Sequence, residues 1–521
     1  MPLDEQRAWS LTDDEVKTLA RWACAIEDHF SAMRKTPTPM DLEWGKDGET
    51  GELFILQARP ETVHSQQEGT LLHYEITAPK EAVCEGLAVG RGIATGTARV
   101  VHDASKLSEV QPGDVLVARN TNPDWEPVMK IAAALVTEEG GRTSHAAIVA
   151  REHGIPAVVA APNARALLAQ AGTVTVSCAE GPVGRVYSGA VPFQTEEIDL
   201  ATLPNPCTSI LVNLADPDQA LGVSRLPVDG VGLVRMEFLF AGAIGVHPLA
   251  LLHPEQLAPD VAAQVAAHTA GWDSPQTFFI DRLSTGNARI AAAFHPRPVI
   301  VRFSDFKSNE YAHLLGGESF EPTEENPMIG WRGASRYAHP IFKEAFALEV
   351  AAMKRVRNTL GFDNAHVMVP FCRTPEEGQS VLNELIAGGL PQAGGDGVPL
   401  KVYVMAEIPS NVLLAAEFAA LFDGFSIGSN DLTQLVYGVD RDSAIVSQLF
   451  DDDGPALKEA CRMLLVAARA SGTPVGICGQ APSDHPEFAA FLVSHGISSI
   501  SVTPDAVLSV TRSVADAERE L

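Results

Sequence analysis

The sequence is poor in cysteine and in positive charge. It holds 7 cysteines in 521 residues, and no two of them form a CxxC pair. This usage excludes a disulfide framework and a thiolate zinc site, and it is typical of a reducing compartment. Lysine and arginine number 38 against 66 aspartates and glutamates, which gives a net charge of −28. Such an acidic chain repels phosphate backbones and anionic lipid, so we expect neither nucleic acid nor membrane as a partner.

Long apolar runs are also missing. The most apolar stretch, Phe238–Leu252, has 15 residues and contains a histidine and a proline, so it is too short to span a bilayer. The first residues, MPLDEQRAWSLTDDEV, are acidic and polar, unlike a signal peptide. Hydrophobic residues nevertheless make up 46% of the chain, which is enough to build large cores. We therefore expect a cytoplasmic globular protein.

The first 190 residues predict two unequal parts. Thr12 and Glu15 form a T-x-x-E capping box ahead of a helical apolar pattern, and residues 41–63 predict a hairpin. Residues 1–80 are too few for a convincing core of their own. Residues 81–190 alternate short strand candidates with a helical run, which predicts a compact α/β domain, and the proline-containing, acidic segment 191–208 is interpreted as a linker.

The remaining residues, 209–521, predict a barrel. Eight apolar strand-like runs alternate with helical segments there: SILVNL, VGLVRM, VIVRF, VMVPF, VYVMAE, FSIGS, VGICG and SISVT. This pattern is typical of a (β/α)8 TIM barrel. The predicted fold class is α/β, with a small α/β domain followed by this barrel.

Polar side chains follow several of these strands, where barrel enzymes carry their active sites. Glu407 and Asp431 leave adjacent strands, and Mg²⁺ prefers a few such carboxylates when substrate and water complete its shell. Arg235 and Arg302 can bind a phosphate or carboxylate with their planar forks. For any one of these charges the alternative is a solvated rim position, and Cys478 alone would be a small core residue. The candidates at the strand ends are Arg235, Glu237, Arg302, Glu407, Ser426, Gly428, Ser429, Asn430, Asp431 and Cys478.

A histidine motif lies in the α/β domain. In GGRTSHAAIVAREHG, residues 140–154, His145 falls in the first turn of a predicted helix. Free helical N–H groups and the positive end of the dipole favour an anion there, which suits a phosphorylated imidazole. Histidine can also hold a phosphoryl group covalently. The alternative is a capping segment with an incidental histidine, and His153 fits that alternative.

Two stretches resemble signatures of one enzyme family. GGRTSHAAIVAR is similar to the phosphohistidine signature of the PEP-utilising enzymes, and DGFSIGSNDLTQLVYGVDR, from Asp423 to Arg441, resembles their second signature. VRFSDFKSNEY, ENPMIGWRGASRY, EIPSN and GICGQAPSDHPEF are most similar to the phosphoenolpyruvate synthase (pyruvate, water dikinase) branch of that family. The hairpin DLEWGKDGETGELFILQARPETV looks like the last hairpin of the family's ATP-grasp domain, so the resemblance covers nearly the whole chain.

The resemblance implies a swivelling domain that carries phosphate on His145 between two sites. ATP and water would yield AMP, phosphate and phosphohistidine, and the barrel would then convert pyruvate, bound with Mg²⁺, into phosphoenolpyruvate. Glu407 and Asp431 would bind the metal, and Cys478 would move the proton of the methyl carbon. Arg332 is a weaker candidate. The resemblance assigns substrate binding to Arg235, Arg302, Glu407, Gly428, Ser429, Asn430, Asp431 and Arg441.

The resemblance also implies partners. Glu43, Gln57 and Arg59 would belong to a C-terminal remnant of the ATP-grasp domain, so we expect ATP to be used only if the rest of that domain is supplied; alone, the chain would run the phosphohistidine–pyruvate half-reaction. Alternatives are a phosphocarrier or PEP-sensing protein of the enzyme I type, or an inactive gene fragment. We further expect a homodimer through the barrel. Thr143 matches the position of a regulatory kinase and phosphatase, the alternative being a helix cap.

Overall fold

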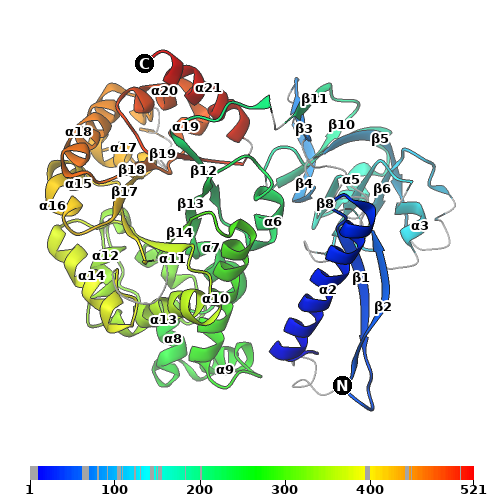
Figure 1. Cartoon of the computed structure of the whole chain (residues 1–521), viewed down its shortest axis with the longest axis horizontal. Coiled ribbons are helices and arrows are strands. Elements are labelled where there is room, and N and C mark those ends of the chain that lie inside the picture. Colours follow the sequence, from blue (N-terminus) through cyan, green and yellow to red (C-terminus); the bar gives the residue numbers. More distant parts are fainter. Residues whose placement is uncertain are drawn as a thin grey trace. The chain divides into compact units, whose positions relative to one another are not determined.

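The chain divides into two compact units, one running to Thr202 and the other beginning at Leu203. Both are shown in Figure 1. The computed structural model describes residues 10–60, 70–78, 81–90, 92–102, 107, 109–121, 125–129, 131–140, 146–147, 150, 155–181, 183–199, 202–392, 399–440, 445–446, 449–504 and 506–521. In these residues, no helix combines the length and the apolar character that a bilayer crossing needs.

The N-terminal unit begins with the predicted helix and hairpin. Helix α2 (Asp13–Arg34) starts at Thr12, whose hydroxyl accepts from the Glu15 N–H at 3.4 Å, while the Thr12 N–H donates to the Glu15 carboxylate at 2.7 Å. These two bonds complete the capping box. Strands β1 (Met40–Lys46) and β2 (Leu53–Pro60) then pair antiparallel. The helix and the hairpin are thus confirmed.

The α/β domain is a small barrel of seven described strands, closed in the order β10-β4-β8-β7-β6-β5-β9. Its strands β5 to β8 pair in parallel and the others antiparallel. Buried valines and alanines such as Val117, Val136 and Val158 fill it. The elements are β4 (Ala82–Val89), β5 (Ile93–Val100), β6 (Val115–Ala118), α3 (Glu126–Met129), β7 (Ala134–Thr137), β8 (Ala157–Val159), α5 (Ala164–Leu168), β9 (Thr173–Ser177) and β10 (Val183–Ser188).

Part of the predicted linker is a strand. Strand β11 (Phe193–Asp199) lies within residues 191–208 and pairs antiparallel with β3 (Thr70–Ile76). The ring of Phe193 packs near that of Tyr74, with their centroids 6.3 Å apart. The sequence FQTEEID is rich in carboxylates and does not alternate strictly, so its own pattern is that of a loop. A partner strand more than a hundred residues away provides its hydrogen bonds, and a local pattern cannot reveal that partner.

The C-terminal unit is the predicted TIM barrel. Eight described strands pair in parallel in chain order, and β12 also pairs with β19 to close the ring. All eight predicted runs are strands, which confirms the fold class. The strands are β12 (Ser209–Leu214), β13 (Gly230–Arg235), β14 (Val299–Arg302), β15 (Ala365–Val369), β16 (Val402–Ala406), β17 (Gly424–Ile427), β18 (Val475–Ile477) and β19 (Ser499–Val502).

Helices surround this barrel in Figure 1. At its seam, the carboxylate of Glu518 in the last helix accepts from the N–H groups of Cys207 and Thr208 at 2.8 and 2.7 Å. The helices are α6 (Ala220–Val223), α7 (Met236–Leu239), α8 (Pro248–Leu252), α9 (Pro259–His268), α10 (Pro275–Phe294), α11 (Ser308–Ala312), α12 (Ala334–Tyr337), α13 (Lys343–Lys354), α14 (Pro375–Ala387), α15 (Pro409–Leu413), α16 (Ala415–Ala419), α17 (Ser429–Tyr437), α18 (Pro455–Ser471), α19 (Ala481–Asp484), α20 (Pro486–Ser494) and α21 (Val507–Arg519).

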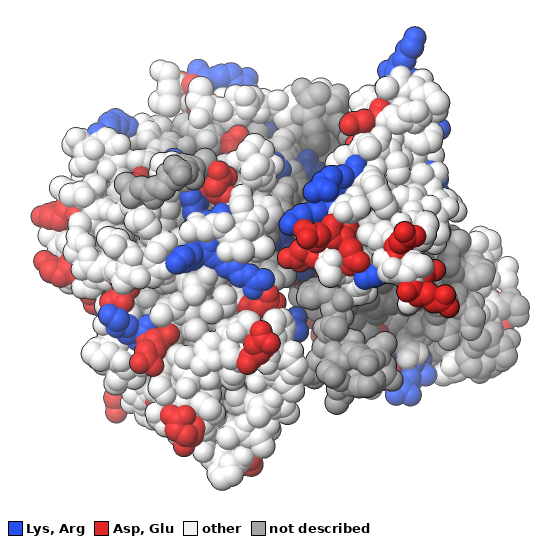
Figure 2. Space-filling model, turned by 60° about the horizontal axis from the view of Figure 1, so that its bottom comes forward, with Lys and Arg blue, Asp and Glu red and all other residues white. Residues whose placement is uncertain are grey.

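The interior of the barrel provides the floor of the site. Leu233, Ile300, Met368, Met405 and Cys478 form one buried cluster from five strands or strand ends. These side chains fill the barrel below the mouth, as in other closed barrels of this size. Acidic and basic side chains are interspersed over the face shown in Figure 2.

Candidate active site at the barrel mouth

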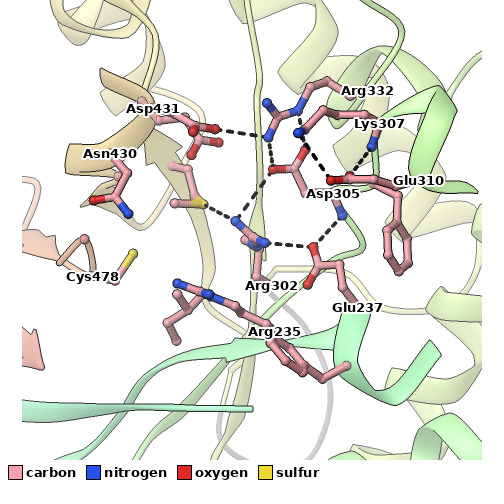
Figure 3. A pocket seen from close by; sticks show the side chains of 17 residues that line it. Arg235, Glu237, Arg302, Asp305, Lys307, Glu310, Arg332, Asn430, Asp431 and Cys478 are labelled. Carbon is pink, nitrogen blue, oxygen red and sulfur yellow. Dashed lines mark hydrogen bonds and ion pairs between the residues drawn. The ribbon is translucent and has the colours of Figure 1, made fainter. Parts of the chain in front are cut away.

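A pocket of about 290 Å³ lies at the C-terminal ends of the barrel strands. Figure 3 shows charged side chains from several strand ends pointing into it. Its lining includes Arg332 and eight of the ten strand-end candidates: Arg235, Glu237, Arg302, Glu407, Gly428, Asn430, Asp431 and Cys478. Ser429 is fully buried beside it, with its hydroxyl 3.5 Å from the Asn430 side-chain oxygen. Arg441 lies outside the described residues. The structure therefore brings the predicted strand-end residues to one place.

Three carboxylates form the acidic centre of the pocket. One oxygen each from Asp305, Glu407 and Asp431 lies within 4.8 Å of the others. Glu407 and Asp431 were predicted from the sequence, whereas Asp305, three residues after strand β14, was not. Asp305 lies in the loop after the strand, and the strand-end rule selected only Arg302 there. Three hard oxygen donors at this spacing are ligands of the kind that Mg²⁺ takes in proteins.

Arg332 holds two of these carboxylates. Its Nε donates to Asp305 Oδ1 at 3.0 Å, and its Nη2 donates to Asp431 Oδ2, also at 3.0 Å. Burial alone would lower the pKa of this guanidinium, but Asp305, Asp431 and Glu407 together raise it above its ordinary value. Arg332, a weaker candidate from the sequence, is thus a fixed positive charge at the centre of the site.

Arg302 is held by two carboxylates, those of Glu237 and Asp305. Its Nη2 donates to Glu237 Oε1 at 2.8 Å, and its Nη1 lies 3.6 Å from Asp305 Oδ2 (Figure 3). The N–H of Asp305 also donates to Glu237 Oε1, at 2.6 Å. Within the described part of the chain, the buried Arg302 Nε has no hydrogen-bond partner. A buried donor without a partner is costly, and an anionic ligand would satisfy it.

Glu407 is buried and carries a perturbed pKa. Its Oε1 accepts from the N–H of Phe371 at 2.7 Å. Burial, followed by the neighbouring charges of Asp431 and Asp305, raises its pKa to about 8, against the opposing effect of Arg302 and Arg332. The Glu407 carboxyl group therefore tends to keep its proton until a cation binds beside it.

Cys478 is a buried thiol at the end of β18. Its sulfur lies 3.8 Å from the carbonyl oxygen of Ile427, to which the thiol donates. Burial raises its pKa above the ordinary value, although Ser426 and Arg302 act in the opposite direction. The thiol form is thus favoured, and a protonated thiol in a pocket can deliver a proton to a bound ligand.

The charges of the pocket nearly balance. Four cationic side chains, Arg235, Arg302, Lys307 and Arg332, line it together with five carboxyl groups, Glu237, Asp305, Glu310, Glu407 and Asp431. Lys307 and Glu310 were not predicted; they pair with each other at 3.2 Å across one turn of α11. A divalent cation would make the formal charge of the pocket positive, as a phosphorylated ligand requires.

The other predicted residues belong to the N-terminal unit. Glu43 and Gln57 are opposite one another in the β1–β2 ladder, as are Asp41 and Arg59, whose side chains pair at 2.8 Å. All four lie on one face of the ribbon because side chains alternate along a strand. His145 and Thr143 lie outside the described residues.

Three family models match the chain. The PEP-binding domain of PEP-utilising enzymes matches residues 194–519, and the mobile domain of the same enzymes matches residues 110–181. The AMP/ATP-binding domain of pyruvate phosphate dikinase matches residues 1–76. The first match includes all eight barrel strands and ends at the last residue of helix α21.

Among curated relatives, the phosphoenolpyruvate synthase of Synechocystis sp. is 52% identical over 99% of this chain and 63% of its own length. The phosphoenolpyruvate synthases of Deinococcus radiodurans and Escherichia coli are 53% and 48% identical, over 97% and 100% of this chain. Each is matched over 64% of its own length, so the chain spans somewhat less than two thirds of these relatives.

Among solved structures, an HpcH/HpaI aldolase/citrate lyase family protein from Burkholderia cenocepacia J2315 aligns with 15% identity and a TM-score of 0.33. The alignment covers 61% of this chain and 94% of that chain. The barrel described above rests on its own strand pairings.

Proposed function

Because the chain belongs to the family of PEP-utilising enzymes, we propose that its barrel transfers a phosphoryl group between phosphoenolpyruvate and a histidine of the same chain. Together with phosphorylation of that histidine by ATP, this half-reaction would serve the conversion of ATP, pyruvate and water into AMP, phosphoenolpyruvate and phosphate. The observation that carries the proposal is the mouth of the barrel, where three carboxylates and three arginines converge inside the region matched by the PEP-binding model.

The three carboxylates fit a divalent metal. Asp305, Glu407 and Asp431 offer only hard oxygen donors, which favours Mg²⁺ over softer metals. Mg²⁺ bound there would neutralise negative charge on the substrate and polarise its oxygens. Glu407 must lose its proton to act as a ligand, so metal binding would release a proton from the site.

The chain's own side chains supply the remaining chemistry. In the direction from phosphoenolpyruvate to pyruvate, the bond between phosphorus and the enol oxygen breaks and a bond from phosphorus to a His145 ring nitrogen forms. Arg302 and Arg235 would hold the phosphoryl and carboxylate groups as charge shifts between them. The Cys478 thiol would then donate its proton to the methylene carbon, which becomes the methyl group of pyruvate.

Neighbouring residues would orient the substrate. The Asn430 side-chain oxygen accepts from the Gln480 N–H at 3.3 Å, so its amide nitrogen is directed by that bond. Gly428 leaves room at the mouth, because a Cβ there would lie 2.7 Å from Glu407 Oε2. By their position in the second signature, Ser429 and Arg441 would take part in the same binding.

Further parts of the proposal rest on the N-terminal unit and on assembly. Glu43, Gln57 and Arg59 share a face of the β1–β2 ribbon and would contribute to a nucleotide site. A phosphate on Thr143 would repel a phosphoryl group arriving at His145. We also propose a homodimer that forms through the barrel.

The test uses phosphoenolpyruvate labelled in its phosphoryl group, incubated with the full chain and Mg²⁺. We expect an acid-labile adduct, because phosphorus bound to a ring nitrogen hydrolyses in acid. His145→Ala should abolish the adduct, and His153→Ala, the matched control in the same segment, should retain it. An unaltered chain that forms no adduct would contradict the proposal.

A further inference from the structure

Phe371, directly after strand β15, has a backbone conformation that large side chains rarely adopt. Its φ is 45°, in the left-handed region, where a bulky residue is unfavourable unless its surroundings hold it there. The side chain is buried, with 2% of its surface exposed. Such strain in a buried residue beside a pocket suggests that the conformation itself has a use.

The backbone of Phe371 contacts one of the three carboxylates. Its N–H donates to Glu407 Oε1 at 2.7 Å. A hydrogen bond from a fixed amide sets the direction of the carboxylate and leaves its other oxygen available. That other oxygen, Oε2, lies in the space that the missing side chain of Gly428 leaves open, since a Cβ there would approach it to 2.7 Å.

The ring of Phe371 contacts the arginine that holds the other two carboxylates. The guanidinium carbon of Arg332 lies 4.1 Å from the ring centroid, and that of Arg373 lies 4.8 Å away. Guanidinium groups at this distance from a phenyl ring are attracted by its electron-rich face. Arg332 in turn donates to Asp305 and Asp431. Phe371 therefore contacts Glu407 directly and is linked to the other two carboxylates through Arg332.

The loop that carries Arg332 is built against Phe371. A Cβ at Gly333 would lie 2.6 Å from the Phe371 Cβ and 2.6 Å from the Pro370 carbonyl oxygen, so only glycine fits. The Ala334 N–H donates to that carbonyl at 3.1 Å. Arg373 fastens the same loop by donating to the Ser335 hydroxyl at 3.1 Å and to the Ile329 carbonyl at 3.2 Å.

We infer that Phe371 is a positioning residue for the metal site: its strained backbone orients Glu407, and its ring places Arg332 so that Asp305 and Asp431 stand at the spacing a divalent cation needs. The inference rests on the proposed function, because it assigns the three carboxylates to a metal. Phe371 itself touches neither metal nor substrate in this scheme. Its effect is exerted through groups one contact away, as for other supports of metal ligands.

The test measures Mn²⁺ binding to the full chain by electron paramagnetic resonance, with no substrate present. Phe371→Leu keeps an apolar side chain of similar volume but removes the aromatic face, so we expect Mn²⁺ affinity to fall about tenfold or more. Phe418→Leu is the matched control, because Phe418 is a fully buried phenylalanine on helix α16. Phe371→Tyr, which restores an aromatic face, should bind Mn²⁺ within about threefold of the unaltered chain.

The outcomes separate this inference from the proposed function. Mn²⁺ affinity that is unchanged in Phe371→Leu, or lowered equally in Phe418→Leu, overturns the inference even if labelled phosphoenolpyruvate modifies the chain. A selective loss in Phe371→Leu supports it, even if no adduct forms at His145. Should Phe371→Tyr fail to fold, as judged by its unfolding transition, the comparison of the two leucine variants still decides.

Discussion

The carboxyl group of Glu349 in helix α13 is fully buried next to the site. It accepts from the Ser304 N–H at 3.0 Å and from the Ser304 hydroxyl at 2.5 Å. Burial raises its pKa to about 7, and these two hydrogen bonds oppose the rise without cancelling it. Ser304 directly precedes Asp305, so this carboxyl group supports the backbone of a proposed metal ligand.

This raised pKa predicts how stability depends on pH. The folded chain binds the Glu349 proton more tightly than the unfolded chain does, so the stabilisation is complete below the ordinary value of 4.5 and is lost as pH rises through about 7. Glu349→Gln imitates the protonated form. Between pH 5 and pH 8, we expect the free energy of unfolding of the wild type to fall by on the order of 1–3 kcal/mol relative to that of this variant. Urea unfolding across this pH range measures the difference.

Glu417→Gln is the control, because Glu417 is an exposed carboxylate on helix α16. Its stability relative to wild type should show little of this trend. A difference between wild type and Glu349→Gln that does not change with pH would show that Glu349 keeps an ordinary pKa in the folded chain.

At the scale of elements, the loop before helix α12 is fixed by a buried ion pair. Arg336 has no exposed surface; it donates to both oxygens of Glu321, at 2.8 and 2.6 Å, and lies 4.1 Å from the Trp331 ring centroid. His247 contacts the same carboxylate at 3.1 Å, and burial lowers the pKa of that histidine. Arg336 is thus the principal counter-ion of Glu321, and the pair holds the loop that presents Arg332.

Replacing only one member of this pair should lower the free energy of unfolding far more than the pair's net contribution, because the other charge stays buried without a partner. Arg336→Met leaves the Glu321 carboxylate buried without its main partner, which typically costs about 3–5 kcal/mol. Glu321→Leu likewise leaves the buried Arg336 guanidinium without its carboxylate partner. The double variant removes both charges, so we expect it to be more stable than the sum of the single losses implies. Urea unfolding of the four proteins measures this coupling, and strictly additive losses would contradict it.

Sequence patterns predicted the elements well because buried parallel strands are continuous apolar runs. The strand-end rule then selected Arg302, Glu407, Asp431 and Cys478 without any knowledge of distances. It missed Asp305, which lies beyond the strand in a loop with no periodic pattern. The central place of Arg332 depends on a loop folding back over the mouth, and the φ of Phe371 is set by tertiary packing, so neither could be predicted from local sequence.

At the scale of the whole molecule, two helices present an apolar surface. Leu413 on α15 is 72% exposed, and Val466 and Met463 on α18 are 55% and 40% exposed. The two helices pack on one another, so these side chains belong to neighbouring elements. Clustered exposed apolar residues commonly mark an interface, which supports the proposed dimer through the barrel.

Charge on this surface should dissociate the dimer. We expect Leu413→Glu combined with Met463→Glu to give a monomer, because each carboxylate would be buried opposite apolar groups of the second copy. Sedimentation equilibrium measures the mass of the particle. Ile386→Glu is the control, since Ile386 on α14 is also exposed, at 59%. A double variant that sediments like the unaltered chain would place the interface elsewhere or exclude it.

The closure of the barrel by β12 and β19 has a consequence for synthesis on the ribosome. Strand β12 ends at Leu214, and strand β19, which closes the ring beside it, ends at Val502. Translation must therefore add roughly 290 residues before the ring can close. At ordinary elongation rates this takes about 15–60 s. During that time the apolar edge SILVNL has no partner on one side. An open strand edge invites pairing with other chains, so this nascent chain should depend on chaperones until its last strand leaves the exit tunnel.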